Sequence, residues 1–202
     1  MNMASSKRTY ELKVRAERQD QTRQQIIDAT VALHEEVGPA QTTIAEIARR
    51  AGVTRLTVYN HFPEDGDLFA ACQGSYLSHH PLPDYTPALA LTDPRDRVRT
   101  VLESLYRSYR EREPMTSKVV RDRGTVPALD RLLTKTMDAQ QATLTTALAA
   151  PYDLRGDCDL RLRATIGLGL DFATWQRFTD AGLTDPSAAD LMTDLILRAA
   201  KA

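Results

Sequence analysis

The side chains in this sequence that are best suited to recognition chemistry stand close together, in residues 55–61. They are Arg55, Thr57, Tyr59, Asn60 and His61. Arginine and asparagine carry hydrogen-bonding groups that match base edges in the DNA major groove, and threonine, tyrosine and histidine can bind phosphate oxygens. This combination is typical of a helix that enters a DNA groove, and it predicts binding of double-stranded DNA.

Two short helices joined at a glycine are predicted to position these side chains, in residues 43–62, which read TIAEIARRAGVTRLTVYNHF. Apolar residues spaced three and four apart give the first helix one apolar face: Ile44, Ile47, Ala48 and Ala51. Thr43 and Glu46 form a capping box at its start, and Thr54 is suited to cap the second helix. Gly52 supplies the positive φ that a tight turn needs. The pattern predicts a helix-turn-helix unit.

The second helix is expected over residues 55–60, with most of its side chains facing outward. We expect DNA contacts from residues at the two helix starts and along the second helix: Thr43, Thr54, Arg55, Leu56, Thr57, Tyr59, Asn60 and His61. Arg55 stands in the first turn, the end that enters the major groove, and is expected to contact a base. Tyr59 and His61 are expected to contact phosphates, as is Thr43.

Residues 43–62, with a leucine six residues further on, resemble the signature of the tetracycline-repressor (TetR) family of transcription regulators. The leading TIA and the closing YNHF match as well as the helix-turn-helix itself. Members often carry a lysine shortly after the His-Phe pair, where residues 63–67 here read PEDGD; these acids complement the positive end of a helix dipole.

The resemblance implies an all-α fold: an N-terminal three-helix helix-turn-helix DNA-binding domain followed by a C-terminal helical ligand-binding and dimerisation domain. It also implies a homodimer that binds operator DNA and responds to a small-molecule effector. We therefore expect a transcription regulator that acts as a repressor and leaves its operator when the effector binds. The alternative is a DNA-binding interaction protein whose C-terminal domain responds to a protein partner or is unregulated.

Three segments are expected along the chain: a basic N-terminal arm at 1–18, the DNA-binding domain at 19–64, and the ligand-binding and dimerisation domain at 65–202. The arm is expected to be flexible or partly helical, and its basic residues are Lys7, Arg8, Lys13, Arg15 and Arg18. Two interpretations stay open: the arm reaches a DNA minor groove, or it is a solvated tail.

Apolar stripes predict helices through the C-terminal part, at residues 98–109, 126–148, 158–181 and 186–199. The first is expected to end near Pro114. The last two carry more apolar surface than one small domain needs, which predicts dimer contacts at Leu168, Leu191 and Leu195. Gly167 and Gly169 would allow close helix approach, either across the dimer or inside one chain.

The resemblance also implies an effector pocket in the C-terminal domain, and bulky or amphipathic side chains are the candidates for its lining: Tyr106, Tyr109, Met137, Asp171, Phe172 and Trp175. Each of these, taken alone, also fits an ordinary core. Asp171 shares a predicted helix face with Leu168 and Trp175. It is therefore either a buried acid, whose partner is Arg121, Arg123, another cation or a cationic ligand, or an exposed residue at a helix edge.

Composition allows a well-packed core, with 42% hydrophobic residues, and gives a net charge of −1. DNA affinity should therefore depend on the local placement of charge and on dimerisation. No apolar run is long enough to span a membrane, no signal peptide is evident, and a cytoplasmic location is expected. Cys72 and Cys158 form no metal-binding pattern. We expect no catalytic site, no metal and no cofactor, because no phosphate loop or nucleophile motif occurs.

Overall fold

The computed structural model describes residues 3–201, with side chains from residue 12 onward. Every regular element in this range is a helix, which confirms the all-α fold. The elements are α1 (Met3–Glu36), η1 (Pro39–Gln41), α2 (Ile44–Ala51), α3 (Arg55–His61), α4 (Asp65–His79), α5 (Thr86–Leu89), α6 (Pro94–Asp122), η2 (Arg123–Thr125), α7 (Pro127–Leu133), η3 (Thr134–Asp138), α8 (Ala139–Ala149), η4 (Ala150–Tyr152), α9 (Asp157–Leu170), α10 (Phe172–Asp180) and α11 (Asp185–Ala199).

The helices form two compact units. Unit 1 contains the described chain up to His79 together with Ser117–Leu132, and unit 2 contains His80–Thr116 and the described chain from Leu133 onward. Helix α6 contributes residues to both. The expected boundary lay between residues 64 and 65, whereas unit 1 includes α4 and runs to His79, because α4 packs on α1. The three functional domains remain a prediction. None of the helices between residues 3 and 201 is long and apolar enough to cross a bilayer.

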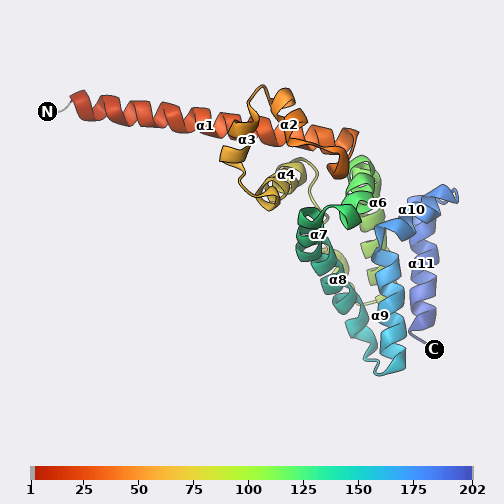
Figure 1. The fold of residues 1–202 in the computed structure, drawn as a ribbon. Coiled ribbons are helices and arrows are strands. Elements are labelled where there is room, and N and C mark those ends of the chain that lie inside the picture. Colours follow the sequence, from red (N-terminus) through yellow and green to blue (C-terminus); the bar gives the residue numbers. More distant parts are fainter. Residues whose placement is uncertain (1–2, 202) are drawn as a thin grey trace. The chain divides into compact units, whose positions relative to one another are not determined.

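Unit 1 is organised around α1, a helix of 34 residues. Helices α2 and α4 pack on α1, and α3 packs on α2 (Figure 1). Their apolar faces meet in one core: Ile26, Ile27, Leu33, Ile47, Ala48, Val58, Phe62, Leu68 and Cys72. Residues 3–18 of the predicted arm are the first part of α1. This part of the helix extends past the helices α2, α3 and α4 that pack at the other end of α1 (Figure 1). Residues 1 and 2 and the side chains of Lys7 and Arg8 lie outside the described part.

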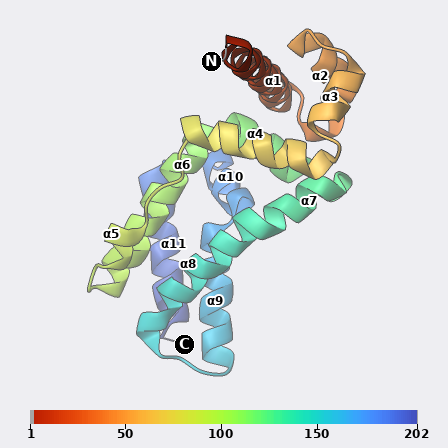
Figure 2. The same ribbon diagram turned by 90° about the vertical axis from the view of Figure 1, so that its left-hand side faces the viewer.

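In unit 2, α9 packs between α8 on one side and α11 on the other (Figure 1). In the view of Figure 2, α8 lies in front of α11. Ion pairs join α6 to α11 along their length: Arg95 with Asp194 at 2.8 Å, Arg99 with Asp190 at 2.8 Å and Arg110 with Asp185 at 2.7 Å. The largest fully buried side chains of this unit include Trp175, Tyr106 and Phe172. All three were predicted to line the effector pocket, and they lie in unit 2.

The predicted end of a helix near Pro114 is wrong, because α6 continues through this proline to Asp122. Proline removes one helix N–H, which ordinarily favours a break. Burial overrides that preference here: Tyr109, Met115 and Thr116 on either side of the proline are all buried. The ring itself lies on the exposed side of the helix.

The single helix predicted over residues 158–181 is also wrong, because the structure divides it at Asp171 into α9 and α10. Asp171 adopts an extended conformation, with φ −79° and ψ 134°, and its side chain accepts a hydrogen bond from the Thr174 N–H at 3.0 Å. An aspartate that caps the next helix competes with continuation of the first one. The helix predicted over 126–148 forms as α7, the π-helical segment η3 and α8 without interruption.

The two glycines of α9 have different surroundings. A methyl group on Gly169 would lie 2.8 Å from Cγ of Met192 in α11, so this glycine allows close packing of α9 on α11 inside one chain. Nothing lies within 4 Å of the corresponding position at Gly167. Close helix approach was expected at Gly167 and Gly169, either across the dimer or inside one chain. Gly169 allows the approach inside one chain.

Candidate nucleic-acid interface and effector region

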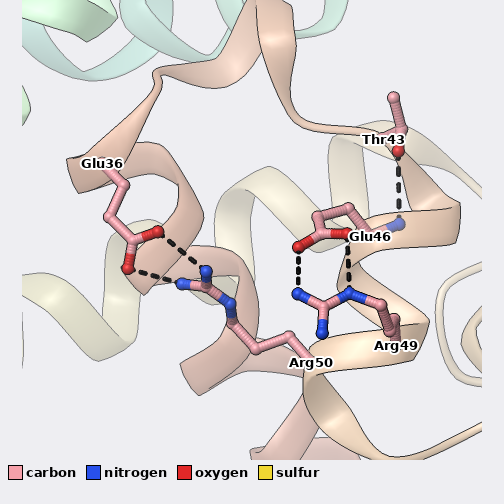
Figure 3. A network of polar contacts seen from close by, with 5 residues as sticks. All are labelled: Glu36, Thr43, Glu46, Arg49 and Arg50. Carbon is pink, nitrogen blue, oxygen red and sulfur yellow. Dashed lines mark hydrogen bonds and ion pairs between the residues drawn. The ribbon is translucent and has the colours of Figure 1, made fainter.

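Threonine side chains cap both helices of the helix-turn-helix. Oγ1 of Thr43 accepts a hydrogen bond from the Glu46 N–H at 3.2 Å (Figure 3), and Oγ1 of Thr54 accepts one from the Thr57 N–H at 3.1 Å. Gly52 ends α2 with φ 68°, in the left-handed region. The predicted caps and turn are therefore confirmed. They hold α3 at a defined angle to α2, and this angle determines where the outward side chains of α3 point.

The acidic half of the predicted capping box has a different role. Glu46 accepts two hydrogen bonds from Arg49, at 2.6 and 2.9 Å, and Glu36 accepts two from Arg50, at 2.6 and 2.8 Å (Figure 3). The Arg50 pair joins α2 to the end of α1. Both guanidinium groups therefore already have an acidic partner. Arg55, by contrast, forms no ion pair with any residue of the described chain.

The outward side of α3 carries unusually exposed apolar side chains. Leu56 is 68% exposed and Tyr59 is 50% exposed, and Arg55 and Asn60 are exposed beside them. Thr57 is half-buried, and its hydroxyl lies 2.8 Å from that of Thr54. Exposed leucine and tyrosine on a short helix indicate a surface that a partner covers. The assignment of single residues to bases or phosphates remains a prediction.

A hollow of about 470 Å³ lies beside the end of α3. Its lining comes from α1, α3 and α4: Gln19, Arg23, Asn60, His61, Asp67, Ala70 and Ala71. The guanidinium of Arg23 lies over the ring of Phe62, 4.1 Å from its centroid, where a cation and an aromatic face attract each other. His61 is half-buried in this hollow and therefore less accessible than Tyr59.

The end of α6 holds the turn that precedes α2, a contact that the sequence did not reveal. Asp122 is buried and accepts a hydrogen bond from the Ala40 N–H at 2.9 Å. Arg121 lies against the same carboxylate at 2.7 Å and donates to the Val37 carbonyl at 3.1 Å. The Arg121 guanidinium, followed by the Ala40 N–H, holds the pKa of Asp122 below its usual range. Gly38, with φ 92°, allows the turn to approach these side chains.

His34 lies near this contact in a buried position, with its ring stacked on that of Phe69 at 5.4 Å. Burial lowers the pKa of His34 to about 4, although the negative charge of Asp122 acts in the opposite direction. The imidazole is therefore neutral at pH 7. Cys72, in the same core, has its pKa raised to about 12 by burial, and both cysteines are free thiols.

In unit 2, the aromatic residues predicted to line the effector pocket lie together around the break between α9 and α10. The hydroxyls of Tyr106 and Tyr109 donate to the carbonyls of Gly169 at 3.0 Å and Leu170 at 2.7 Å. The ring of Tyr109 lies 5.2 Å from that of Phe172 and 5.8 Å from that of Trp175. The break leaves carbonyls at the end of α9 without helical partners, and the two tyrosines supply donors to them.

Two of the predicted lining residues differ from this group. Asp171 is half-buried and acts as the cap of α10. Arg121 and Arg123, two possible partners for a buried Asp171, bind Asp122 and Asp130 instead. Met137 is half-buried in the π-helical segment η3. Among the described side chains, from residue 12 to residue 201, no group of acidic, histidine or cysteine residues is suited to a metal ion.

The predicted dimer residues are exposed on two helices that pack side by side. Leu168 of α9 is 59% exposed, and Leu191 and Leu195 of α11 are 43% and 40% exposed. Leu160, two turns before Leu168 on α9, is exposed as well. The structure thus presents a row of apolar side chains from both helices, although their contact with a second chain remains a prediction.

Comparison with known proteins places the helix-turn-helix unit in a family. Residues 26–72 match the model of bacterial regulatory proteins of the tetR family. The HTH-type transcriptional regulator BetI of Yersinia pestis (strain Pestoides F) is 36% identical over 86 residues, which cover 42% of this chain and 43% of BetI. BetI of Pectobacterium carotovorum subsp. carotovorum (strain PC1) is likewise 36% identical over 86 residues, with 44% of its length covered. The match thus spans less than half the length of these curated relatives.

Solved structures resemble the chain over most of its length. A TetR-like transcriptional regulator from Rhodococcus sp. RHA1 has a TM-score of 0.60 at 22% identity, covering 88% of this chain and 94% of that one. NalD, the secondary repressor of the MexAB-OprM multidrug efflux pump in Pseudomonas aeruginosa, has a TM-score of 0.57 at 24% identity and covers 90% and 96%. RolR in complex with resorcinol has a TM-score of 0.51 at 22% identity and covers 91% and 89%. The family-model match and the likeness to BetI thus identify residues 26–72 as similar to the tetR-type DNA-binding domain, and these solved structures show that the chain shares their fold.

Proposed function

We propose that this protein is a homodimeric repressor that binds operator DNA through α3 and leaves it when a small-molecule effector binds in unit 2. The observation that carries the proposal is the outward side of α3, where Arg55 has no acidic partner in the described chain and Leu56 and Tyr59 are exposed. Such a protein acts where the chromosome is, in the cytoplasm, and the proposal assigns it no catalytic step.

The proposed division of roles among the DNA-contacting residues is supported by their places on α2 and α3. Arg55 occupies its first turn and has a free guanidinium, whose planar fork matches N7 and O6 of guanine. Thr43 uses its oxygen to accept from a backbone N–H, which leaves its hydroxyl hydrogen for a phosphate. Tyr59 lies further along, where a phenol hydroxyl suits the phosphate backbone.

Binding to randomised operators at two salt concentrations tests this division. Arg55→Ala should lower affinity by about 1–3 kcal/mol per half-site and relax the preference at one base pair, whereas Tyr59→Phe should weaken all sequences equally. Arg49→Ala is the matched control, because it makes the same charge change at a guanidinium that already binds Glu46. Equal loss on every sequence for Arg55→Ala would make Arg55 a phosphate contact and contradict its assignment.

A second chain is proposed to cover the exposed leucines of α9 and α11. A recognition helix reads one half-site, so two copies are needed for a two-fold symmetric operator. Effector control is supported by the neighbours: RolR was solved with resorcinol, and NalD represses a multidrug efflux pump. The alternative is a DNA-binding protein whose unit 2 responds to a protein partner or is unregulated. Compounds that bind unit 2 but leave operator affinity unchanged would favour that alternative.

A further inference from the structure

One charged residue interrupts the buried side of α6 in unit 2. The buried residues of this helix follow a spacing of three and four through Leu105, Tyr109 and Thr116. Arg112 occupies the same stripe, three residues after Tyr109 and four before Thr116. Arginine is rarely placed on a core-facing stripe unless its charge has a partner.

Three other arginines of α6 have such a partner. Arg95, Arg99 and Arg110 each bind an aspartate of α11. Arg112 is half-buried, and no carboxylate in the described chain lies within 4.0 Å of its guanidinium nitrogens. Arg97 and Arg107 of the same helix have no ion pair among the described residues either, but Arg97 donates to the Leu91 carbonyl and Arg107 is exposed. Arg112 differs from both because it lies on the buried stripe of α6.

The guanidinium of Arg112 is nevertheless held in place. Nε donates to the Ser108 carbonyl at 3.2 Å and to the Ser108 hydroxyl at 3.1 Å, and Nη2 donates to that hydroxyl at 2.7 Å. Ser108 is itself buried. An arginine has five N–H donors, so these bonds leave the edge formed by Nη1 and Nη2 available for two parallel bonds to a carboxylate.

Two tyrosines, Tyr85 and Tyr109, lie near enough to Arg112 to feel its charge. Its positive charge acts on the hydroxyls of Tyr85 and Tyr109, and it opposes the burial that raises the pKa of both, to about 12 for Tyr85. Both tyrosines are buried. The acid that acts on Tyr109 is Asp171, whose carboxylate is bonded to the Thr174 N–H. The cluster thus offers one cation, two phenol groups and aromatic surface.

We infer that Arg112 anchors an organic carboxylate, whose apolar body would lie against the rings of Tyr85 and Tyr109. This deepens the proposed function, on which it rests, by naming the chemical class of the effector. A carboxylate fits better than a neutral ligand because it supplies the missing counter-charge of Arg112. It fits better than an ammonium ion, which the guanidinium would repel.

The test compares acids with neutral analogues of the same shape on the full chain. Benzoate, phenylacetate and octanoate are titrated beside their primary amides, with the fluorescence of Trp175 as the signal, since its ring lies 5.8 Å from that of Tyr109. At least one acid should bind about 10- to 100-fold more tightly than its amide. Arg112→Met should abolish this preference, whereas Arg107→Met, a change at an exposed arginine of the same helix, should preserve it.

Three outcomes would overturn the inference: no acid of the panel binds, the amides bind as tightly as the acids, or Arg112→Met keeps the preference. Arg112→Gln serves as the second neutral variant if the methionine variant does not fold. Operator binding without ligand is measured on the same samples. Carboxylate binding at Arg112 that leaves operator affinity unchanged would support the site and contradict the proposed function, so that the two failures are distinguishable.

Discussion

Replacement of Gly38 by alanine should destabilise the protein strongly, because Gly38 is buried in the turn before α2. Gly38 has φ 92° and ψ 162°, a conformation that residues with a Cβ rarely adopt. An added methyl group would also collide with the side chains of Arg121 and Asp122 and lie 3.2 Å from Cβ of Lys118. One substitution therefore strains the backbone and displaces the contact between α6 and the turn before α2.

The magnitude follows from these two effects. Backbone strain of this kind costs about 1–3 kcal/mol. Movement of Asp122 away from the Ala40 N–H, now 2.9 Å away, leaves a buried carboxylate with one bond fewer and costs about 1–3 kcal/mol more. The sum of about 2–6 kcal/mol is a large share of the roughly 5–15 kcal/mol by which folded domains are stable.

Urea unfolding measures this loss, at equal protein concentrations because the proposed dimer would make stability depend on concentration. With a slope near 3 kcal/mol per molar urea, the midpoint for Gly38→Ala should fall by about 0.7–2 M. Gly74→Ala is the matched control, because it adds the same methyl group inside α4 with nothing within 4 Å. It should raise stability by about 0.4–1 kcal/mol. A midpoint for Gly38→Ala equal to that of the wild type would refute the reasoning.

Three further changes test other parts of the structure. The pKa of His34 is about 4 in the folded chain and 6.5 in the unfolded chain, so the unfolded state takes up the proton first as the pH falls. About 3 kcal/mol of stability that is present above pH 6.5 should therefore be lost between pH 6.5 and pH 4. His34→Gln should reduce this loss when unfolding is measured as a function of pH. Asp171→Ala removes the cap of α10 and should cost about 1 kcal/mol in thermal unfolding, with Asp180→Ala, an exposed change at the other end of α10, as its control. Leu168→Glu should give monomers in light scattering, whereas an unchanged dimer would exclude α9 from the interface.

The sequence predicted those parts of the fold that depend on neighbouring residues. The caps at Thr43 and Thr54 and the turn at Gly52 require only atoms within a few positions, so residue type and spacing were sufficient. The same holds for α11, whose start is marked by the Thr184 cap and a proline. Helix propensity and capping act locally, and their signals remain visible in a single sequence.

The errors arose where distant residues decide the local structure. Pro114 should have ended a helix, but the burial of its neighbours keeps α6 intact. The contact between Asp122 and Ala40 joins residues 82 positions apart, and no spacing rule indicates such a pair. The helix face that Asp171 was expected to share with Leu168 and Trp175 does not exist, because α9 ends at Leu170.

Polar residues on apolar stripes were the signal that could have corrected these errors. Asp171 interrupts an apolar stretch, and the structure places a helix start at that position. Asp122, a buried acid, accepts a backbone N–H from a turn far away in sequence. In both cases the fold supplies the hydrogen-bond partner that burial of a polar group demands. Arg112 lies on the buried stripe of α6, where Ser108 accepts its hydrogen bonds but no carboxylate of the described chain forms an ion pair with it. By the logic that explains the two aspartates, the partner of Arg112 should come from outside the fold, as an anion that binds there.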